Sequence, residues 1–256
     1  MSPRKTSTRR GYSVLPSLLT TGNLFMGFFS LVSAVTGHPL RAAILIFVAM
    51  VFDFTDGPIA RLTGSSTSFG VEYDSLADAL SFGVAPAMLA YLYGLHRYER
   101  YGWLLAFLFA AGSALRLARF NTTARPGKAS AYFQGMSTPT ASATLAGVVL
   151  LLNEFQVPES NRAVIFAGLV PLLAALMISN LPYPSFKTVR LSRKQAFYAS
   201  VGAVLLIVII AAEPAVVLPT LFSAYALSGI VLGLRRRKSG TAKESPPPVT
   251  NKPPQG

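Results

Sequence analysis

Four aspartates stand close together in a chain that is otherwise poor in acids. Asp53 and Asp56 are three residues apart, Asp74 and Asp78 are four apart, and the whole chain has only ten acidic residues. On a helix, either spacing puts both carboxylates on one face. Two such helices would present two acidic pairs to each other across a small gap.

Carboxylates at this density predict a metal site. They repel one another unless cations or protons neutralise them. Mg²⁺ and similar hard cations take oxygen ligands and often hold substrate phosphates at the same time. Ionisable residues beside long apolar runs are costly and by default mark a functional site. We therefore expect a metal site at a membrane interface that handles a phosphorylated substrate. The alternative is that the acids are interfacial charges paired with Arg61.

The composition indicates an all-α, polytopic membrane protein. Of its 256 residues, 52% are hydrophobic and 13% are charged, and the mean hydropathy is +0.47, which is unlike a soluble domain. The net charge of +13 does not indicate nucleic acid, because the bases lie in loops and tails between apolar runs. The absence of cysteine excludes disulfides and thiol chemistry.

About eight transmembrane helices are expected to position the acids. Runs of this length and hydropathy suffice to span a bilayer, and the expected ranges are about 15–35, 40–62, 70–95, 103–120, 136–152, 163–181, 197–212 and 216–234. Glycine and proline in 81–86 predict a kink in the third span. The chain then divides into a basic tail (1–12), one transmembrane catalytic domain (13–234) and a disordered basic, proline-rich tail (235–256), with no cleavable signal at the N-terminus.

The basic residues predict which side of the membrane carries the acids. Most of them fall in the two tails and in the loops 122–135 and 183–196. Lysine and arginine are enriched in cytoplasmic loops. We therefore expect both termini and the acidic site to face the cytoplasm, in a multi-pass protein of the cell inner (cytoplasmic) membrane.

The acidic stretch also resembles a known motif. It matches the signature of the CDP-alcohol phosphotransferase family at the fixed positions Asp53, Asp56, Gly57, Ala60, Arg61, Gly70, Asp74 and Asp78. The resemblance implies that family's helical membrane fold. It also implies a divalent cofactor, Mg²⁺ or Mn²⁺.

Within the family, the chain looks most like the branch that transfers a phosphatidyl group from CDP-diacylglycerol to the hydroxyl of L-serine, giving phosphatidylserine and CMP. The similarity lies in residues 18–25, 74–86, 114–121 and 179–187. Ser137 departs from that branch, which usually has proline there. The alternatives are a phosphatidylglycerophosphate or phosphatidylinositol-phosphate synthase of the same family and, more distantly, a metal-coupled transporter. A transporter would place its acids near the midplane and often shows repeated halves, and neither is visible here.

The resemblance also assigns roles to individual residues. Asp53, Asp56 and Asp74 would bind the metals, and Asp78 would take the proton from serine's hydroxyl while also contacting the second metal. The site for CDP-diacylglycerol would contain Asp56, Gly57, Ala60, Arg61, Gly70 and Asn23. A bond from Asn23 to a neighbouring helix is the alternative for that residue.

The contacts to serine are expected near the end of the fourth span. Arg116 and Arg119 share a helix face there, and guanidinium groups bind carboxylates bidentately. Ser81 and Asn121 are further candidates, although each of the four could instead serve the packing of the bundle. The expected partners are CDP-diacylglycerol, L-serine, the lipid bilayer and a second copy of the chain in a homodimer.

Overall fold

Long helices account for most of the described chain. The computed structural model describes residues 14–63, 67–123, 132–184 and 193–238. Its helices are α1 (Val14–Val35), α2 (Pro39–Thr63), α3 (Ser68–Asp78), a π-helical turn η1 (Ala79–Val84), α4 (Ala85–Tyr93), a 3₁₀ turn η2 (Leu95–Tyr98), α5 (Glu99–Thr123), α6 (Thr138–Glu154), α7 (Glu159–Ile178), α8 (Arg193–Ala212) and α9 (Pro214–Lys238). Two short strands, β1 (Tyr132–Gln134) and β2 (Pro182–Pro184), complete the list.

Every expected span coincides with a helical segment. Within the described ranges, six segments are long and apolar enough to cross a membrane: 15–35, 39–62, 68–93, 95–122, 159–178 and 214–234. The fifth and seventh expected spans correspond to α6, which has 17 residues, and to α8, which contains a shorter apolar stretch. The all-α, multi-pass membrane architecture is thus confirmed, and the expectation of about eight helices is compatible with it.

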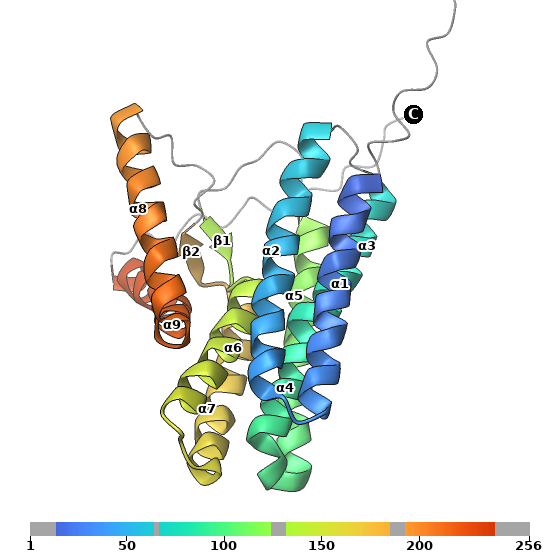
Figure 1. Cartoon of the computed structure of the whole chain (residues 1–256), viewed down its shortest axis with the longest axis vertical. Coiled ribbons are helices and arrows are strands. Elements are labelled where there is room, and N and C mark those ends of the chain that lie inside the picture. Colours follow the sequence, from blue (N-terminus) through green and yellow to red (C-terminus); the bar gives the residue numbers. More distant parts are fainter. Residues whose placement is uncertain (1–13, 64–66, 124–131, 185–192, 239–256) are drawn as a thin grey trace, which may run out of the picture.

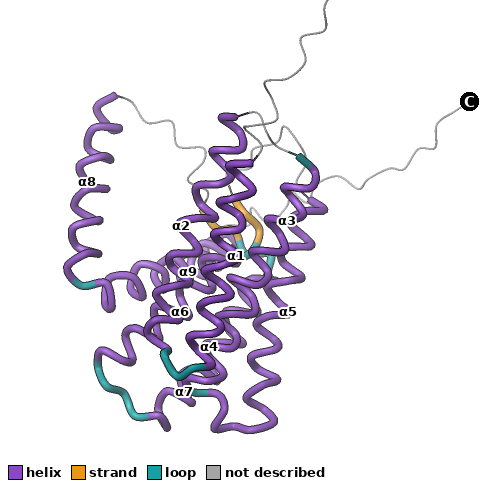
Figure 2. Tube along the Cα trace, turned by 45° about the vertical axis from the view of Figure 1, so that its right-hand side comes forward, coloured by secondary structure: helices purple, strands orange, loops and turns teal. Residues whose placement is uncertain are grey.

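The helices form one bundle that includes α9, which packs against α6, and α8 lies at the edge of this bundle. In Figure 1, α1 and α2 lie side by side and antiparallel, with α3, α4 and α5 beside them and with α6 and α7 next to α2. Buried alanines on α2 (Ala42, Ala43 and Ala49) allow close approach of its neighbours. Figure 2 shows α8 standing apart from the bundle, and this helix packs mainly against α9.

A π-helical turn interrupts the third span at 79–84, where the sequence predicted a kink. Pro86 has no N–H to donate to the carbonyl of Phe82 one turn earlier. The hydroxyl of Ser142 on α6 donates to this carbonyl instead. The turn is also close-packed, because a Cβ on Gly83 would lie 2.9 Å from the Oγ of Ser113 on α5. The freed backbone is therefore satisfied by a neighbouring helix.

A two-stranded sheet was not predicted from the sequence. β1 and β2 pair antiparallel, with Phe133 opposite Tyr183. Gly135 follows β1 with a φ of +76°, and a Cβ there would meet the carbonyl of Met177 at 2.6 Å. The phenol of Tyr183 is fully buried and donates to the carbonyl of Ala226 at 3.1 Å. The sheet therefore joins the segment before α6 to the segment after α7. Tyr183 links this sheet to the middle of α9.

Candidate active site

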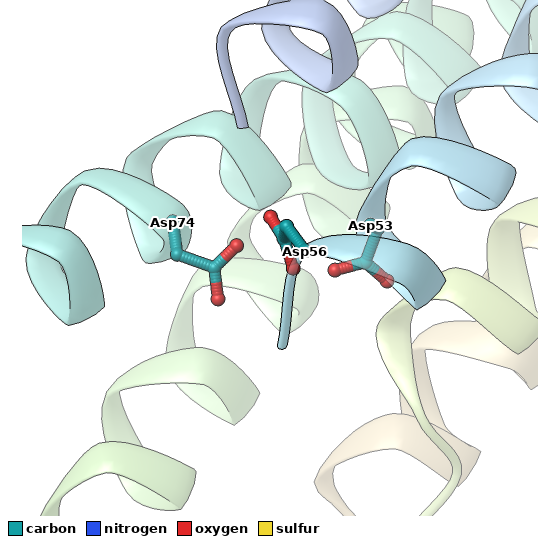
Figure 3. Close-up of side chains that lie close together, drawn as sticks. All are labelled: Asp53, Asp56 and Asp74. Atoms are coloured by element: carbon teal, nitrogen blue, oxygen red, sulfur yellow. The ribbon is translucent and has the colours of Figure 1, made fainter. Parts of the chain in front are cut away.

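Three of the four aspartates meet in one cluster. Asp53 and Asp56 lie one turn apart near the end of α2, and Asp74 lies on α3. One carboxylate oxygen from each falls within 4.8 Å of the others. Figure 3 shows Asp74 facing the two acids of α2, with Asp56 in the middle. The i, i+3 pattern read from the sequence therefore does bring the acids of two helices together.

The cluster has the chemistry of a divalent metal site. All three groups offer hard oxygen donors, which Mg²⁺ and Mn²⁺ prefer. The Oδ1 atom of Asp74 is buried and has no hydrogen-bond partner among the described residues. Buried polar atoms normally have a partner, and three neighbouring negative charges require a counter-ion. The residues present therefore fit a bound cation.

Asp78 lies next to this cluster but outside the set of three. It ends α3 and is only 9% exposed. It interacts electrostatically with Asp53 and Asp74. Its Oδ1 accepts a hydrogen bond from the side-chain amide of Asn23 at 3.0 Å. A role for Asp78 as a metal ligand remains a prediction, since the grouped oxygens are those of the other three acids.

A cavity of about 190 Å³ opens beside the cluster, between α1, α2 and α3. Five of the six residues predicted to bind CDP-diacylglycerol line it, namely Asp56, Gly57, Ala60, Arg61 and Gly70. The lining also includes residues that sequence reasoning did not assign: Pro16, Ser17, Thr20, Thr67 and Val71. The unusually polar start of the first span was the available signal for the α1 residues.

Asn23 is the predicted donor contact that does not line this cavity. Its side chain is fully buried, and it bonds to Asp78 on α3. The structure thus shows the alternative considered from the sequence, a polar bond between neighbouring helices. Asn23 therefore contacts Asp78 from the interior of the bundle and not from the cavity.

The two arginines of α5 have different surroundings. Arg116 is half-buried, lies within hydrogen-bond reach of Thr138 at 3.4 Å, and interacts electrostatically with Asp78. Its buried Nε has no partner in the described part of the chain. Arg119 instead donates to the carbonyl of Ile178 at 3.1 Å and to the side chains of Gln134 and Asn180. Arg116 thus interacts with an acid of the site, whereas the hydrogen bonds of Arg119 described here join α5 to β1 and to the end of α7.

The remaining two candidates for serine contacts are engaged in the packing. Ser81 is fully buried and donates to the backbone carbonyl of Asn23 at 3.0 Å. Asn121 donates to the hydroxyl of Ser75 on α3 at 2.8 Å. Ser81 exposes no surface to a substrate, so the structural alternative holds for it. Asn121 joins α5 to the helix that carries Asp74 and Asp78.

Comparison with known proteins agrees with this geometry. The profile of the CDP-alcohol phosphatidyltransferase family matches residues 13–180, a range that contains α1 to α7 and all four aspartates. The chain belongs to this family. The match ends before β2, so α8 and α9 lie outside the family profile.

Three relatives in this family carry the same name, CDP-diacylglycerol–serine O-phosphatidyltransferase. A protein of Helicobacter pylori is 36% identical over 181 residues, covering 71% of this chain and 76% of its own length. One of Mycobacterium tuberculosis is 31% identical over 219 residues, covering 83% and 74%. One of Bacillus subtilis is 33% identical over 173 residues, covering 68% and 91%.

Proposed function

We propose that this chain transfers the phosphatidyl group of CDP-diacylglycerol to the hydroxyl of L-serine, giving phosphatidylserine and CMP. The observation that carries the proposal is the acidic cluster of Asp53, Asp56 and Asp74 at the edge of the α1–α2–α3 cavity. Membership of the family and the shared name of the relatives support the choice of donor and acceptor.

In this proposal Asp53, Asp56 and Asp74 hold divalent metal, Mg²⁺ or Mn²⁺. When bound, such ions neutralise the diphosphate and stabilise the charge that develops on its oxygens. The cavity residues Gly57, Ala60 and Gly70 have small or absent side chains, so the cytidine diphosphate can approach the backbone closely. Arg61 supplies a cation at the same wall, suited to a phosphate oxygen.

Asp78 is proposed as the general base. A hydroxyl is a weak nucleophile until a positioned base accepts its proton. The carboxylate of Asp78 would take the proton of serine's hydroxyl as that oxygen bonds to the lipid-side phosphorus. The bond from this phosphorus to the bridging oxygen breaks, and CMP leaves with the electron pair. Asp78 accepts the side-chain amide of Asn23 through Oδ1, which holds its carboxylate in place.

Arg116 is the proposed contact for serine's carboxylate. Its guanidinium lies near Asp78, and its buried Nε has no hydrogen-bond partner among the described atoms. An acceptor with its carboxylate at Arg116 and its hydroxyl at Asp78 would be oriented for attack. Arg119, Ser81 and Asn121 are assigned to the support of the site, because each is engaged with protein groups.

The membrane setting forms part of the proposal. The acids lie toward one end of α2 and α3, so the polar half of the donor would remain in water while its acyl chains lie among the helices. The distribution of basic residues supports a cytoplasmic location for this end and for both termini, in the cell inner (cytoplasmic) membrane. Resemblance to the family supports a homodimer.

The test is CMP release by the purified protein from CDP-diacylglycerol with Mg²⁺ or Mn²⁺. Serine, glycerol 3-phosphate and inositol phosphate are supplied separately as acceptors. We expect release with serine alone and loss of release in excess chelator. Release only with a phosphorylated alcohol would keep the metal site and donor and overturn the acceptor. An Arg116→Met variant should raise the KM for serine much more than the KM for CDP-diacylglycerol.

A further inference from the structure

Two polar side chains of α1 reach the acid site, although α1 itself contains no acid. The hydroxyl of Thr20 donates to Oδ2 of Asp56 at 2.9 Å, and the amide of Asn23 donates to Oδ1 of Asp78 at 3.0 Å. Residues three apart lie on the same face of a helix. Asp56 belongs to α2 and Asp78 to α3. One face of α1 therefore holds one carboxylate from each of the two acid-bearing helices.

The contact between Asn23 and Asp78 is enclosed. Asn23 has no exposed surface, and Asp78 is 9% exposed, so Asn23 has no surface to offer to a substrate. Its Oδ1 has no hydrogen-bond partner among the described residues. A buried acceptor without a partner lowers the stability of the fold. Asn23 is thus poorly explained as a device for stability, and any effect on the reaction passes through Asp78.

The backbone of Asn23 is fixed by the segment that follows Asp78. Ser81 in the π-helical turn donates to the carbonyl of Asn23 at 3.0 Å. One turn further along α1, Gly27 packs so closely on Ser81 that a Cβ would collide with it. The amide of Asn23 therefore approaches Asp78 from a rigid support, which is the condition for holding a reactive side chain in one orientation.

Thr20 has a second acceptor within reach, the carbonyl of Pro16 at 3.1 Å. A hydroxyl has one proton to donate, and hydrogen bonds to a charged carboxylate are roughly twice as strong as neutral ones. The bond to Asp56 is therefore the favoured one. Thr20 is also buried at the wall of the cavity, so its hydroxyl fixes a carboxylate oxygen at the edge of the acidic cluster.

We propose that Thr20 and Asn23 are positioning residues that fix the orientation of the carboxylates of Asp56 and Asp78 relative to each other. The proposal rests on the proposed function for its kinetic part. Thr20 acts on a member of the acidic cluster and Asn23 acts on the base, so their loss should have different signatures. Loss of Thr20's hydroxyl weakens metal binding. Loss of Asn23's amide lowers turnover and leaves metal binding in place.

The experiment compares Thr20→Val, Thr20→Ser and Asn23→Leu with the wild type. Valine and leucine approximate the original shapes without the donor, and serine restores the hydroxyl of Thr20. Ser30→Ala is the matched control. Ser30 is buried on α1 two turns beyond Asn23 and donates to the carbonyl of Ala42 on α2 at 2.8 Å, so it joins α1 to α2 without touching an acid.

Two readouts are taken from each purified variant. The first is kcat and KM for serine and CDP-diacylglycerol at saturating Mn²⁺. The second is the rise in melting temperature as Mn²⁺ is added to the chelator-treated protein without substrates. A ligand that binds the folded state stabilises it in proportion to the logarithm of its concentration over Kd, so this rise reports metal binding independently of activity.

We expect Asn23→Leu and Thr20→Val to lower kcat by roughly 10–100-fold, the range found when outer-shell partners of metal sites are removed. Asn23→Leu should leave both KM values within about threefold, because Asn23 has no exposed surface that could contact a substrate. Thr20→Val should also require more Mn²⁺ for the same rise in melting temperature. Thr20→Ser should behave like the wild type. Ser30→Ala should lose stability and keep its kcat.

Several results would overturn the proposal. An unchanged kcat in Asn23→Leu removes the role of Asn23, and equal losses in Thr20→Ser and Thr20→Val remove the role of the hydroxyl. An equal loss of kcat in Ser30→Ala would assign the effect to helix packing in general. If Asn23→Leu does not fold, the comparison of Thr20→Val with Thr20→Ser still tests whether a hydrogen bond from α1 to an acid affects kcat and Mn²⁺ binding. A wild type that releases no CMP with serine contradicts the proposed function, and the Mn²⁺ response still tests Thr20.

Discussion

The molecule contains two polar clusters that handle charge in opposite ways. At the ends of α2 and α3, Asp53, Asp56 and Asp74 bring like charges together and leave a buried oxygen without a protein partner. At the end of α5, Arg119 brings one positive charge to neutral acceptors from β1 and from the end of α7. The first cluster is incomplete without a ligand, whereas the second is completed by the chain itself.

The difference separates function from support. A group of mutually repelling carboxylates lowers the stability of the fold until a cation binds. A guanidinium that donates to several acceptors stabilises the segments that it joins. Damage to the acidic cluster should therefore remove activity and spare or improve the stability of the metal-free protein. Substitution of Arg119 should lower the stability of the protein and leave its activity largely intact.

The largest expected effect is that of Asp78→Asn. Asparagine keeps the shape and removes the base, and positioned general bases contribute on the order of 10²–10⁴-fold. Turnover should fall by about that factor. The melting temperature in chelator should hold or rise, because a buried charge next to Asp53 and Asp74 is gone. Rate and thermal-melting assays on the same preparation check this, and a large loss of stability would make Asp78 a structural residue.

Asp74→Asn should act on metal binding as well as on turnover. The variant replaces one of the three grouped carboxylates by a neutral amide, which is a much weaker cation ligand, so the stabilisation by added Mn²⁺ should largely disappear. For the wild type this stabilisation reaches about 2.7 kcal/mol at a hundred times Kd. Glu72→Gln is the control, because Glu72 is an exposed acid on the same helix outside the group. A response to Mn²⁺ that survives in Asp74→Asn would contradict the metal assignment.

Arg119→Met should lower stability by roughly 2–4 kcal/mol, since hydrogen bonds to charged groups are worth about 1.5–3 kcal/mol each and are not additive. Methionine retains much of the apolar stem. The dependence of melting temperature on Mn²⁺ should match the wild type after the downward shift. If the variant instead had normal stability and a much higher KM for serine, Arg119 would belong to the acceptor site.

The smallest expected effect is that of Tyr183→Phe, which removes one buried hydrogen bond to Ala226 and should cost about 0.5–1.5 kcal/mol. Burial and the neighbouring Tyr225 raise the pKa of Tyr183 to about 12. Its neutral form is therefore favoured by folding, and its contribution is complete below pH 10 and lost as pH rises toward 12. Thermal melting from pH 8 to 11.5 should fall more steeply in the wild type than in the variant.

The acid site was predictable because it depends on the spacing of residues that are close together in the sequence. The spacing of Asp53 and Asp56, and of Asp74 and Asp78, fixes a shared helix face whatever the rest of the chain does. The eight apolar ranges followed from hydropathy in the same way. The polar start of the first span pointed to α1, but no spacing rule indicated that Thr20 and Asn23 would each bond to an acid of a different helix.

Features that depend on distant segments could not be read in this way. Arg116 and Arg119 share a face by spacing, yet their long side chains meet different neighbours, Thr138 in one case and Gln134 in the other. The strands β1 and β2 are three residues each, and β2 begins and ends with proline, which sequence patterns count against a strand. The end of α7 approaches the chain closely at Gly135, directly after β1, and no spacing in the sequence reveals this contact between distant segments.

The π-helical turn at 79–84 has a consequence for how the site tolerates insertions and deletions. Each residue advances an α-helix by about 100°, and a π-turn accommodates one residue more than a regular turn. Removing any single residue from this segment would restore a regular helix. Because the wide turn holds that extra residue within one revolution, Asp74 and Asp78 would keep their orientation relative to α4. A deletion from a regular α-helical part of the same span would instead rotate the two acids by about 100° relative to α4. The π-helical turn is thus the place in this span where the loss of one residue leaves the alignment of the two acid-bearing helices intact.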